Sequence, residues 1–195
     1  MEEKKIILEA SKKLYHLKLV AGTSGNISMR HPEKEDHYFI TASGLAYDTM
    51  VEDDIVEIDK DGVPVNPNQK PSSEWKMHVE VYKSYPNINA IVHTHSPFAT
   101  AFAVNRETIP VILIEMKPFL GGDIKVAPYA INGSQQLADN IIPYLKDRNS
   151  CLLANHGTIS CGNTMEEAFT SCEYVEDAAK IYYYAKTAGT PVVLE

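Results

Sequence analysis

Two histidines one residue apart, His93 and His95, end an apolar run and constrain the fold of this chain more than any other feature. Residues 89–95 are rich in isoleucine, valine and alanine and follow a Pro86-Asn87 break, which predicts a buried strand. Residues i and i+2 of a strand point to the same face, about 6–7 Å apart. Two imidazoles at that spacing can converge on one metal ion at the strand end. The alternative is one buried, hydrogen-bonded histidine and one exposed histidine.

Two further stretches favour the metal site. A third histidine, His156, lies in Asn155-His-Gly157 at the end of a second apolar run, residues 151–154. The motif Pro71-Ser-Ser-Glu-Trp75 precedes an amphipathic stretch over 76–85 and predicts a helix with a serine cap and Glu74 in its first turn. Three neutral imidazoles and a carboxylate form a zinc set, either closed with four ligands or with a displaceable fourth. Manganese and cobalt suit the same ligands.

The remaining periodicities predict strands in the middle of the chain and helices around them. Hairpin-like spacing indicates a largely antiparallel sheet, covered by helices on both faces. Small residues at 20–26 and at Ala42-Ser-Gly44 are either ordinary loops or nests of bare amides that bind an anion. We expect His31 and His37, which flank a polar turn, to be solvated. Further helices are expected at 3–20 and 97–104. A helix capped by Ser134 is expected to run to 146, and another is expected to begin at a Thr164-x-x-Glu167 capping box. Further strands are expected at 27–30, 37–41, 54–59, 63–65, 151–154 and 158–161.

Composition limits the class of protein. A chain of 195 residues with 44% hydrophobic and 23% charged residues is typical of one globular domain, here residues 1–195. The net charge of −8 argues against nucleic acid or an anionic membrane as a partner. No run approaches a membrane span, and the N-terminus is no signal peptide. The odd number of cysteines, three, indicates reduced thiols and a cytoplasmic protein.

Six motifs occur in the order in which one known family carries them: Gly22-Thr-Ser-Gly-Asn26, Thr41-Ala-Ser-Gly44, Pro71-Ser-Ser-Glu-Trp75, His93-Thr-His95, Ala127-Pro-Tyr129 and His156-Gly157. On these motifs the chain resembles the class II aldolase/adducin family, most closely its bacterial L-fuculose-1-phosphate aldolase group. The resemblance covers nearly the whole chain. It implies a three-layer α/β/α sandwich with a mostly antiparallel central sheet. It also implies a fourfold-symmetric homotetramer with active sites at subunit interfaces.

The resemblance also assigns roles to residues. It implies a zinc ion held by His93, His95 and His156, with Glu74 as a further ligand and as the general acid/base. It implies reversible cleavage of a ketose 1-phosphate, such as L-fuculose 1-phosphate, into dihydroxyacetone phosphate and an aldehyde. The substrate phosphate would be bound by amides and hydroxyls of Gly25, Asn26, Ser43, Gly44, Ser72 and Ser73.

One departure from the aldolase pattern lies in residues 111–116. Aldolases of this group use a tyrosine from a neighbouring subunit to protonate the leaving aldehyde, and residues 111–116 contain no tyrosine. Glu115 in this stretch instead resembles the acid/base glutamate of methylthioribulose-1-phosphate dehydratases of the same superfamily, or else pairs with Lys117. The alternative to an aldolase that cleaves an L-fuculose-1-phosphate-like sugar is therefore a dehydratase or aldolase that acts on methylthioribulose or deoxyribulose 1-phosphate. A pentulose-phosphate 4-epimerase is disfavoured because those enzymes carry aspartate at the position of Glu74. A non-catalytic, adducin-like module is disfavoured by the intact set of site residues.

Overall fold

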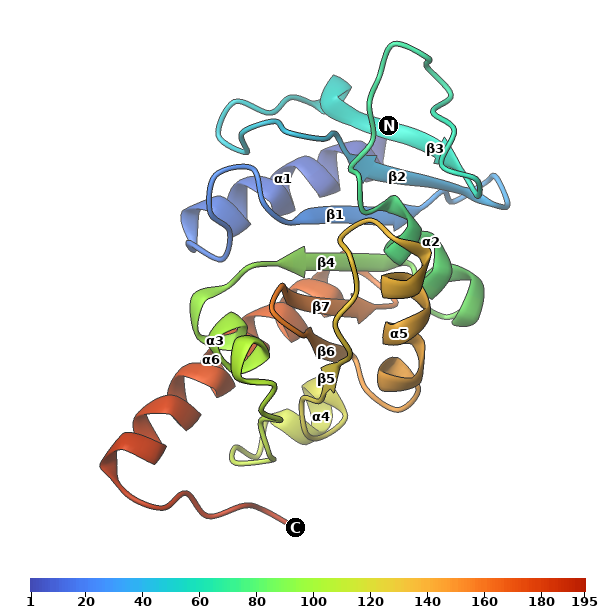
Figure 1. Cartoon of the computed structure of the whole chain (residues 1–195). Coiled ribbons are helices and arrows are strands. Elements are labelled where there is room, and N and C mark those ends of the chain that lie inside the picture. Colours follow the sequence, from blue (N-terminus) through green and yellow to red (C-terminus); the bar gives the residue numbers. More distant parts are fainter.

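The computed structural model describes all 195 residues. Its central sheet has seven strands in the spatial order β3-β2-β1-β4-β7-β6-β5 (Figure 1). All neighbouring pairs are antiparallel except β5 and β6, which are parallel. The predicted, mostly antiparallel sheet is therefore confirmed. The strands are β1 (Asn26–Arg30), β2 (His37–Thr41), β3 (Ile55–Asp59), β4 (Ala90–Thr94), β5 (Val126–Ala127), β6 (Ser150–Leu153) and β7 (Gly157–Gly162).

Helices cover both faces of this sheet, which confirms the three-layer arrangement. Alternation along β4 separates two cores: Ile91 packs with α2 (Trp75–Ser84) and α5 (Gln135–Leu145), whereas Val92 packs with α1 (Glu2–His16) and α6 (Met165–Ala188). A third core lies between α6, α3 (Pro97–Asn105) and α4 (Met116–Leu120). A short 3₁₀ helix, η1 (Glu52–Asp54), precedes β3. None of these helices is both long and apolar enough to cross a membrane.

The predicted caps of the two C-terminal helices are present. The Ser134 hydroxyl accepts a hydrogen bond from the Leu137 N–H at 3.1 Å, and the Thr164 hydroxyl accepts one from the Glu167 N–H at 3.2 Å. The Glu167 carboxylate accepts the N–H of Asn163 at 2.9 Å rather than that of Thr164. The hydroxyl half of the expected capping box is therefore present, and the carboxylate half binds the N–H one residue earlier than expected.

Two predictions about local structure are wrong. Helix α2 begins at Trp75, with Glu74 as its N-cap residue and no side-chain cap. The Ser72 hydroxyl instead accepts the Glu74 N–H at 3.3 Å, which turns the chain into the helix before its first turn. Residues 63–65 form no strand, because only an isolated bridge between Ile58 and Pro64 pairs them with β3.

The prediction that His31 is solvated is also wrong. Its side chain is buried and stacks on the Phe39 ring with 5.0 Å between ring centroids. Its Nδ1 accepts the N–H groups of Glu33 and Lys34, so the turn folds over the imidazole. His37 is half-buried, and its Nδ1 lies 3.1 Å from the Glu57 carboxylate.

Candidate active site

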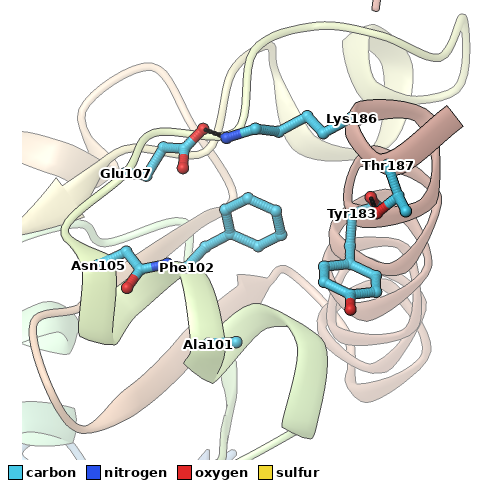
Figure 2. Close-up of a pocket in the computed structure, with 7 residues that line it drawn as sticks. All are labelled: Ala101, Phe102, Asn105, Glu107, Tyr183, Lys186 and Thr187. Carbon is cyan, nitrogen blue, oxygen red and sulfur yellow. Dashed lines mark hydrogen bonds and ion pairs between the residues drawn. The ribbon is translucent and has the colours of Figure 1, made fainter. Parts of the chain in front are cut away.

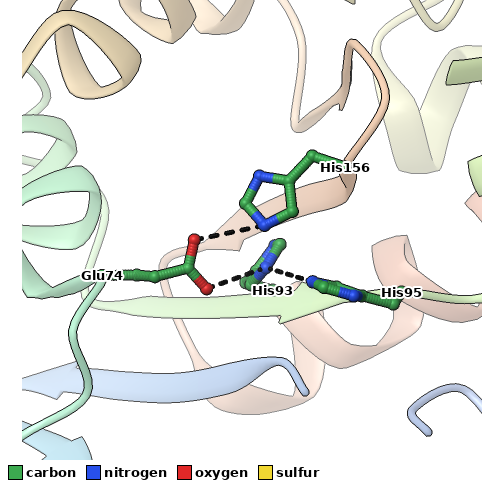
Figure 3. Close-up of side chains that lie close together, drawn as sticks. All are labelled: Glu74, His93, His95 and His156. Atoms are coloured by element: carbon green, nitrogen blue, oxygen red, sulfur yellow. Dashed lines mark hydrogen bonds and ion pairs between the residues drawn. The ribbon is translucent and has the colours of Figure 1, made fainter. Parts of the chain in front are cut away.

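Four side chains converge where β4 ends (Figure 3). His93 comes from β4 and His95 from the residues just after it, His156 comes from the β6–β7 turn, and Glu74 comes from the N-terminus of α2. Their ligand atoms all lie within 4.8 Å of one another. The period of two along β4 aims both strand histidines at the face that carries α2, as the His-x-His motif predicted.

The distances inside this cluster fit a metal ion. His93 Nε2 lies 3.2 Å from Glu74 Oε2 and 3.1 Å from His95 Nε2, and His156 Nε2 lies 3.3 Å from Glu74 Oε1. Bonds of about 2.0–2.1 Å to a tetrahedral zinc would separate its ligand atoms by about 3.4 Å. Glu74 Oε1 and His156 Nε2 are buried and make no hydrogen bond. Buried polar atoms are almost always satisfied, so a divalent cation among these four residues explains the pair.

The protonation of His93 is tied to its neighbours. Its Nδ1 donates to the Thr158 carbonyl at 2.7 Å, which directs Nε2 at the cluster, as outer hydrogen bonds do for metal-binding histidines. Burial alone would lower the pKa of His93, but the Glu74 carboxylate outweighs it and raises that pKa. Burial would likewise raise the pKa of Glu74, and the charge of His93 reverses this and lowers it. The raised pKa of His93 and the lowered pKa of Glu74 both favour an ion pair between Nε2 and Oε2, which lie 3.2 Å apart.

The other two histidines are neutral. Burial and the nearby charge of His93 lower the pKa of His95 to about 4 and that of His156 to about 4. A neutral imidazole has a lone pair free to bind a cation, whereas a protonated one has none. Both residues are thus ready to act as metal ligands near neutral pH.

Two glycines let loops approach the end of β4. A Cβ on Gly157 would lie 2.2 Å from the Thr94 carbonyl oxygen and 3.0 Å from the His95 ring. A Cβ on Gly25 would lie 2.7 Å from the His93 carbonyl oxygen, and its φ of +81° also favours glycine. Each residue allows a contact that a side chain would prevent, and so places its loop beside the histidines.

A polar cleft of about 370 Å³ opens beside the cluster. No lysine or arginine lines it, and several of its residues carry hydroxyls or follow tight turns. All six residues predicted to bind phosphate line this cleft together with Glu74 and His95: Gly25, Asn26, Ser43, Gly44, Ser72 and Ser73. Four more lining residues, Ala21, Thr23, Ser24 and Ala42, belong to the two stretches of small residues that the sequence analysis singled out, whereas Asn132 was missed.

Asn26 connects the cleft to Glu74. Its Nδ2 donates to Glu74 Oε2 at 2.8 Å, and its Oδ1 accepts from His78 Nε2 at 2.5 Å. The sequence analysis did not single out His78, although it follows Glu74 by four residues. That spacing places both on one face of α2, which was the available signal.

Glu115 lies outside the histidine cluster. It is half-buried and forms the N-cap residue of α4. It makes no ion pair with Lys117, whose ammonium donates to the carbonyl of Glu195 instead. The catalytic role assigned to Glu115 by resemblance stays a prediction.

A second hollow, of about 310 Å³, lies between α3 and the C-terminal part of α6 (Figure 2). Phe102 and Tyr183 line it, and the Lys186 ammonium bridges to the Glu107 carboxylate at 2.5 Å. It contains no histidine or cysteine and no group of metal-binding residues. The cleft beside Glu74 is therefore the candidate active site.

Comparison with known proteins agrees with this choice. Residues 5–183 match the family model described as "Class II Aldolase and Adducin N-terminal domain". The chain belongs to the class II aldolase/adducin family. This match covers most of the chain, and it includes Glu74 and the three histidines.

Named relatives of this class II aldolase family member are aldolases with two kinds of substrate. The chain is 38% identical to the 5-deoxy-D-ribulose 1-phosphate aldolase of Bacillus thuringiensis serovar kurstaki, over 99% of this chain and 90% of that protein. It is 34% identical to the L-fuculose phosphate aldolase of Escherichia coli K12, over 98% and 89% of the two chains. A solved structure of an L-fuculose 1-phosphate aldolase superposes with a TM-score of 0.94 at 39% identity, covering 100% of this chain and 91% of that chain. Membership of the family, together with these relatives, shows that the protein is an aldolase and therefore a lyase. The relatives differ in the sugar they are named for, so they do not identify its sugar substrate.

Proposed function

We propose that the protein is a metal-dependent aldolase that cleaves a ketose 1-phosphate reversibly into dihydroxyacetone phosphate and an aldehyde. One observation carries the proposal: the Glu74 carboxylate lies between three histidines at the head of a polar cleft lined by serines and glycines. A carboxylate placed both to bind a cation and to face the substrate can serve as a general base.

The substrate we propose is a ketose 1-phosphate that ends in a methyl group. The substrates in the names of the two relatives differ in length, 5-deoxyribulose 1-phosphate and fuculose 1-phosphate. Both share the phosphorylated end, the ketone beside it and a terminal methyl. The phosphorylated end becomes dihydroxyacetone phosphate, so one phosphate site serves for either sugar. A 5-deoxypentulose and a 6-deoxyhexulose are therefore the first two substrates to compare.

The phosphate end would sit among short polar groups. Ser43, Ser72 and Ser73 supply hydroxyls, and Gly25 and Gly44 supply backbone without side chains. Asn26 would contribute its backbone, since both polar ends of its side chain are committed to Glu74 and His78. The N-terminus of α2 begins beside Ser73 and adds its dipole. An acidic protein can bind a phosphate ester in this way without a cluster of lysines.

The chemistry assigns Glu74 the transfer of one proton, in addition to its proposed place among the metal ligands. Cleavage of the bond beyond the ketone leaves an electron pair on the carbon next to the carbonyl, while the hydroxyl on the departing carbon gives its proton to a base at the aldehyde end of the cleft and becomes the aldehyde. A bound divalent cation, proposed to be zinc with manganese or cobalt as alternatives, supplies Lewis-acid stabilisation of the resulting oxyanion. Glu74 delivers a proton to that carbon in the cleavage direction and removes it in the synthesis direction. His93, His95 and His156 would hold the cation.

Three broader parts of the account are proposals as well. We propose that residues 1–195 form a single domain, which is supported by one continuous sheet formed by strands between residues 26 and 162. A homotetramer with active sites at its subunit interfaces is proposed from the family resemblance alone. A cytoplasmic location is proposed from the three free, buried cysteines, Cys151, Cys161 and Cys172.

The test is an assay for dihydroxyacetone phosphate released from ketose 1-phosphates, with and without a chelator. The panel contains deoxyribulose, fuculose, rhamnulose and methylthioribulose 1-phosphates, and mass spectrometry follows loss of water. Chelator-sensitive release of the triose phosphate supports the aldolase and identifies its sugar. Loss of water without triose phosphate would instead support a dehydratase that uses Glu115.

A further inference from the structure

A chain of hydrogen bonds runs through the buried space between β1 and α2 and ends at Glu74. Tyr82 Oη lies 2.7 Å from Ser28 Oγ, which lies 2.6 Å from His78 Nδ1. His78 Nε2 lies 2.5 Å from Asn26 Oδ1, and Asn26 Nδ2 lies 2.8 Å from Glu74 Oε2. Ser28, Tyr82, His78 and Asn26 are each at most 2% exposed, so these partners are shielded from bulk water.

The direction of every bond follows from the carboxylate. An ionised Glu74 can only accept, so the amide NH₂ of Asn26 must face it and Oδ1 must face His78. His78 Nε2 must then carry the hydrogen. A neutral imidazole carries only one, so Nδ1 accepts from Ser28, and Ser28 in turn accepts from Tyr82. Burial lowers the pKa of His78 to about 3, in keeping with a neutral ring. Each donor along the chain has one acceptor.

We propose that His78 is a positioning residue that fixes which end of the Asn26 amide faces Glu74. The inference rests on the proposed role of Glu74 as metal ligand and proton carrier. A carboxamide without a fixed neighbour can turn by 180° about its last bond, which exchanges its oxygen and nitrogen. With His78 donating to Oδ1, only one orientation leaves no buried group unpaired. Asn26 is therefore held as a donor to Glu74.

The orientation matters for the metal cluster. Asn26 is paired across the sheet with His93, so its side chain approaches Glu74 beside the ligand histidines. An amide turned the other way would place Oδ1 against Glu74 Oε2, where two oxygen atoms without a hydrogen repel each other. The carboxylate would then rotate away from His93 and His156. Groups that orient metal ligands in this way typically contribute about 10- to 100-fold to metal affinity or activity.

The test uses His78→Leu, which fills similar space but removes the donor, and His78→Gln, whose amide can again donate to Asn26. The control is His31→Leu, because His31 is likewise buried but its side chain contacts the 31–37 turn rather than Glu74. Ser28→Ala keeps the imidazole but removes the bond that fixes its tautomer, together with the acceptor of the Tyr82 hydroxyl, so it serves if His78→Leu does not fold. Zinc affinity is measured by competition with a chelating dye, and kcat and KM are measured in the zinc-loaded protein.

We expect His78→Leu to lower zinc affinity and kcat about 10- to 100-fold with little change in KM, and Ser28→Ala to act in the same direction more weakly. His78→Gln should restore most of both, and His31→Leu should leave both near wild type while it lowers thermal stability. Folded His78→Leu or Ser28→Ala with unchanged zinc affinity and kcat would overturn the proposal. Zinc affinity needs no substrate, so it still decides the question if the wild type cleaves no ketose phosphate.

The tautomer of His78 gives a second, independent readout. Nitrogen NMR of ¹⁵N-histidine-labelled protein should show His78 as a neutral ring protonated at Nε2 in the wild type. A ring protonated at Nδ1 would contradict the proposal, because Asn26 would then have to present its oxygen to Glu74.

Discussion

His93 Nε2 lies 3.2 Å from Glu74 Oε2, although the two residues belong to different layers of the fold. His93 is on β4 in the central sheet, and Glu74 caps α2 in the layer above it. The pair exists because Ser72 turns the chain into α2 directly over the end of β4. In the proposed mechanism one carboxylate, held in place by an imidazole and an amide, serves both metal binding and proton transfer.

Replacing Glu74 by glutamine tests the proton transfer. Glu74→Gln keeps the size and one oxygen of the side chain but removes the base, so turnover of the preferred ketose 1-phosphate should fall by about 10²- to 10⁴-fold. KM should change much less, because the phosphate site is intact. The measurement is the triose phosphate assay with zinc-loaded protein. Turnover within a few-fold of wild type would mean that another group carries the proton.

Removing the metal should cost both activity and stability. Glu74 Oε1 and His156 Nε2 are buried and unsatisfied without a cation, so the metal-free protein has unpaired polar groups in its core. Zinc at a concentration 100-fold above its Kd stabilises the fold by about 2.7 kcal/mol. Thermal unfolding with a chelator, and again after zinc is restored, measures the difference. A melting temperature that does not respond to zinc would argue against binding at this cluster.

Metal binding should release a proton near neutral pH. The pKa of His93 is raised above its ordinary value of 6.5, so in the metal-free protein this ring keeps its proton to a higher pH than a free histidine. A cation must displace that proton, so zinc affinity should rise with pH until the raised pKa of His93 is passed. His95 and His156, with pKa values of about 4, add no proton in this range. Calorimetry in buffers of different ionisation enthalpy should detect proton release on zinc binding, and this release should shrink as the pH rises through the raised pKa of His93. No proton release at any pH below that pKa would contradict the ion pair.

The phosphate site can be tested at Ser73. This exposed residue lines the cleft at the start of α2, so Ser73→Ala should raise KM for the phosphorylated sugar by about tenfold, the order expected for one hydrogen bond to a charged group. The value of kcat should stay close to wild type. The unphosphorylated ketose is the control, because its slow cleavage should not respond to the change. An equal loss for both sugars would place Ser73 at the reacting carbons rather than at the phosphate.

A substitution at Gly157 tests the backbone contact behind His156. A Cβ there would lie 2.2 Å from the Thr94 carbonyl, so Gly157→Ala must push β7 away from the end of β4. We expect a loss of about 1–3 kcal/mol in the free energy of unfolding, as for other overpacked sites, and weaker zinc binding. Gly189→Ala, where nothing lies within 4 Å of the added Cβ, should change neither. Denaturant unfolding of both variants checks this, and equal stability of the two would contradict the contact.

The sequence predicted the ligand cluster because its signals are local. His93 and His95 share a face through the period of two, and His156 and Glu74 stand at the ends of elements that apolar runs delimit. It could not predict the burial of His31, which depends on a ring stacking from the neighbouring strand. His78 was missed because it occupies an ordinary core position of an amphipathic helix, and only the position of β1 gives it a polar partner.

Asn132 shows the same limit for the cleft. It belongs to a loop far along the chain from the other lining residues, and none of the motifs singled out in the sequence includes it. It reaches the cleft because the next residue, Gly133, packs against the Ser73 backbone, where a Cβ would lie 2.6 Å from the carbonyl oxygen. Contacts of this kind arise from tertiary packing and leave no periodic signal in the sequence.

The most direct test of the central claim is hydrogen exchange into dihydroxyacetone phosphate in D₂O, followed by proton NMR. This half-reaction needs only the proposed product and the proton transfer by Glu74, so it does not depend on which aldehyde the enzyme uses. The zinc-loaded protein should exchange one of the two hydrogens on the carbinol carbon, and both Glu74→Gln and the chelated protein should fail to do so. A wild-type protein that binds zinc at the cluster but exchanges no hydrogen would contradict the assignment of aldol chemistry to this site.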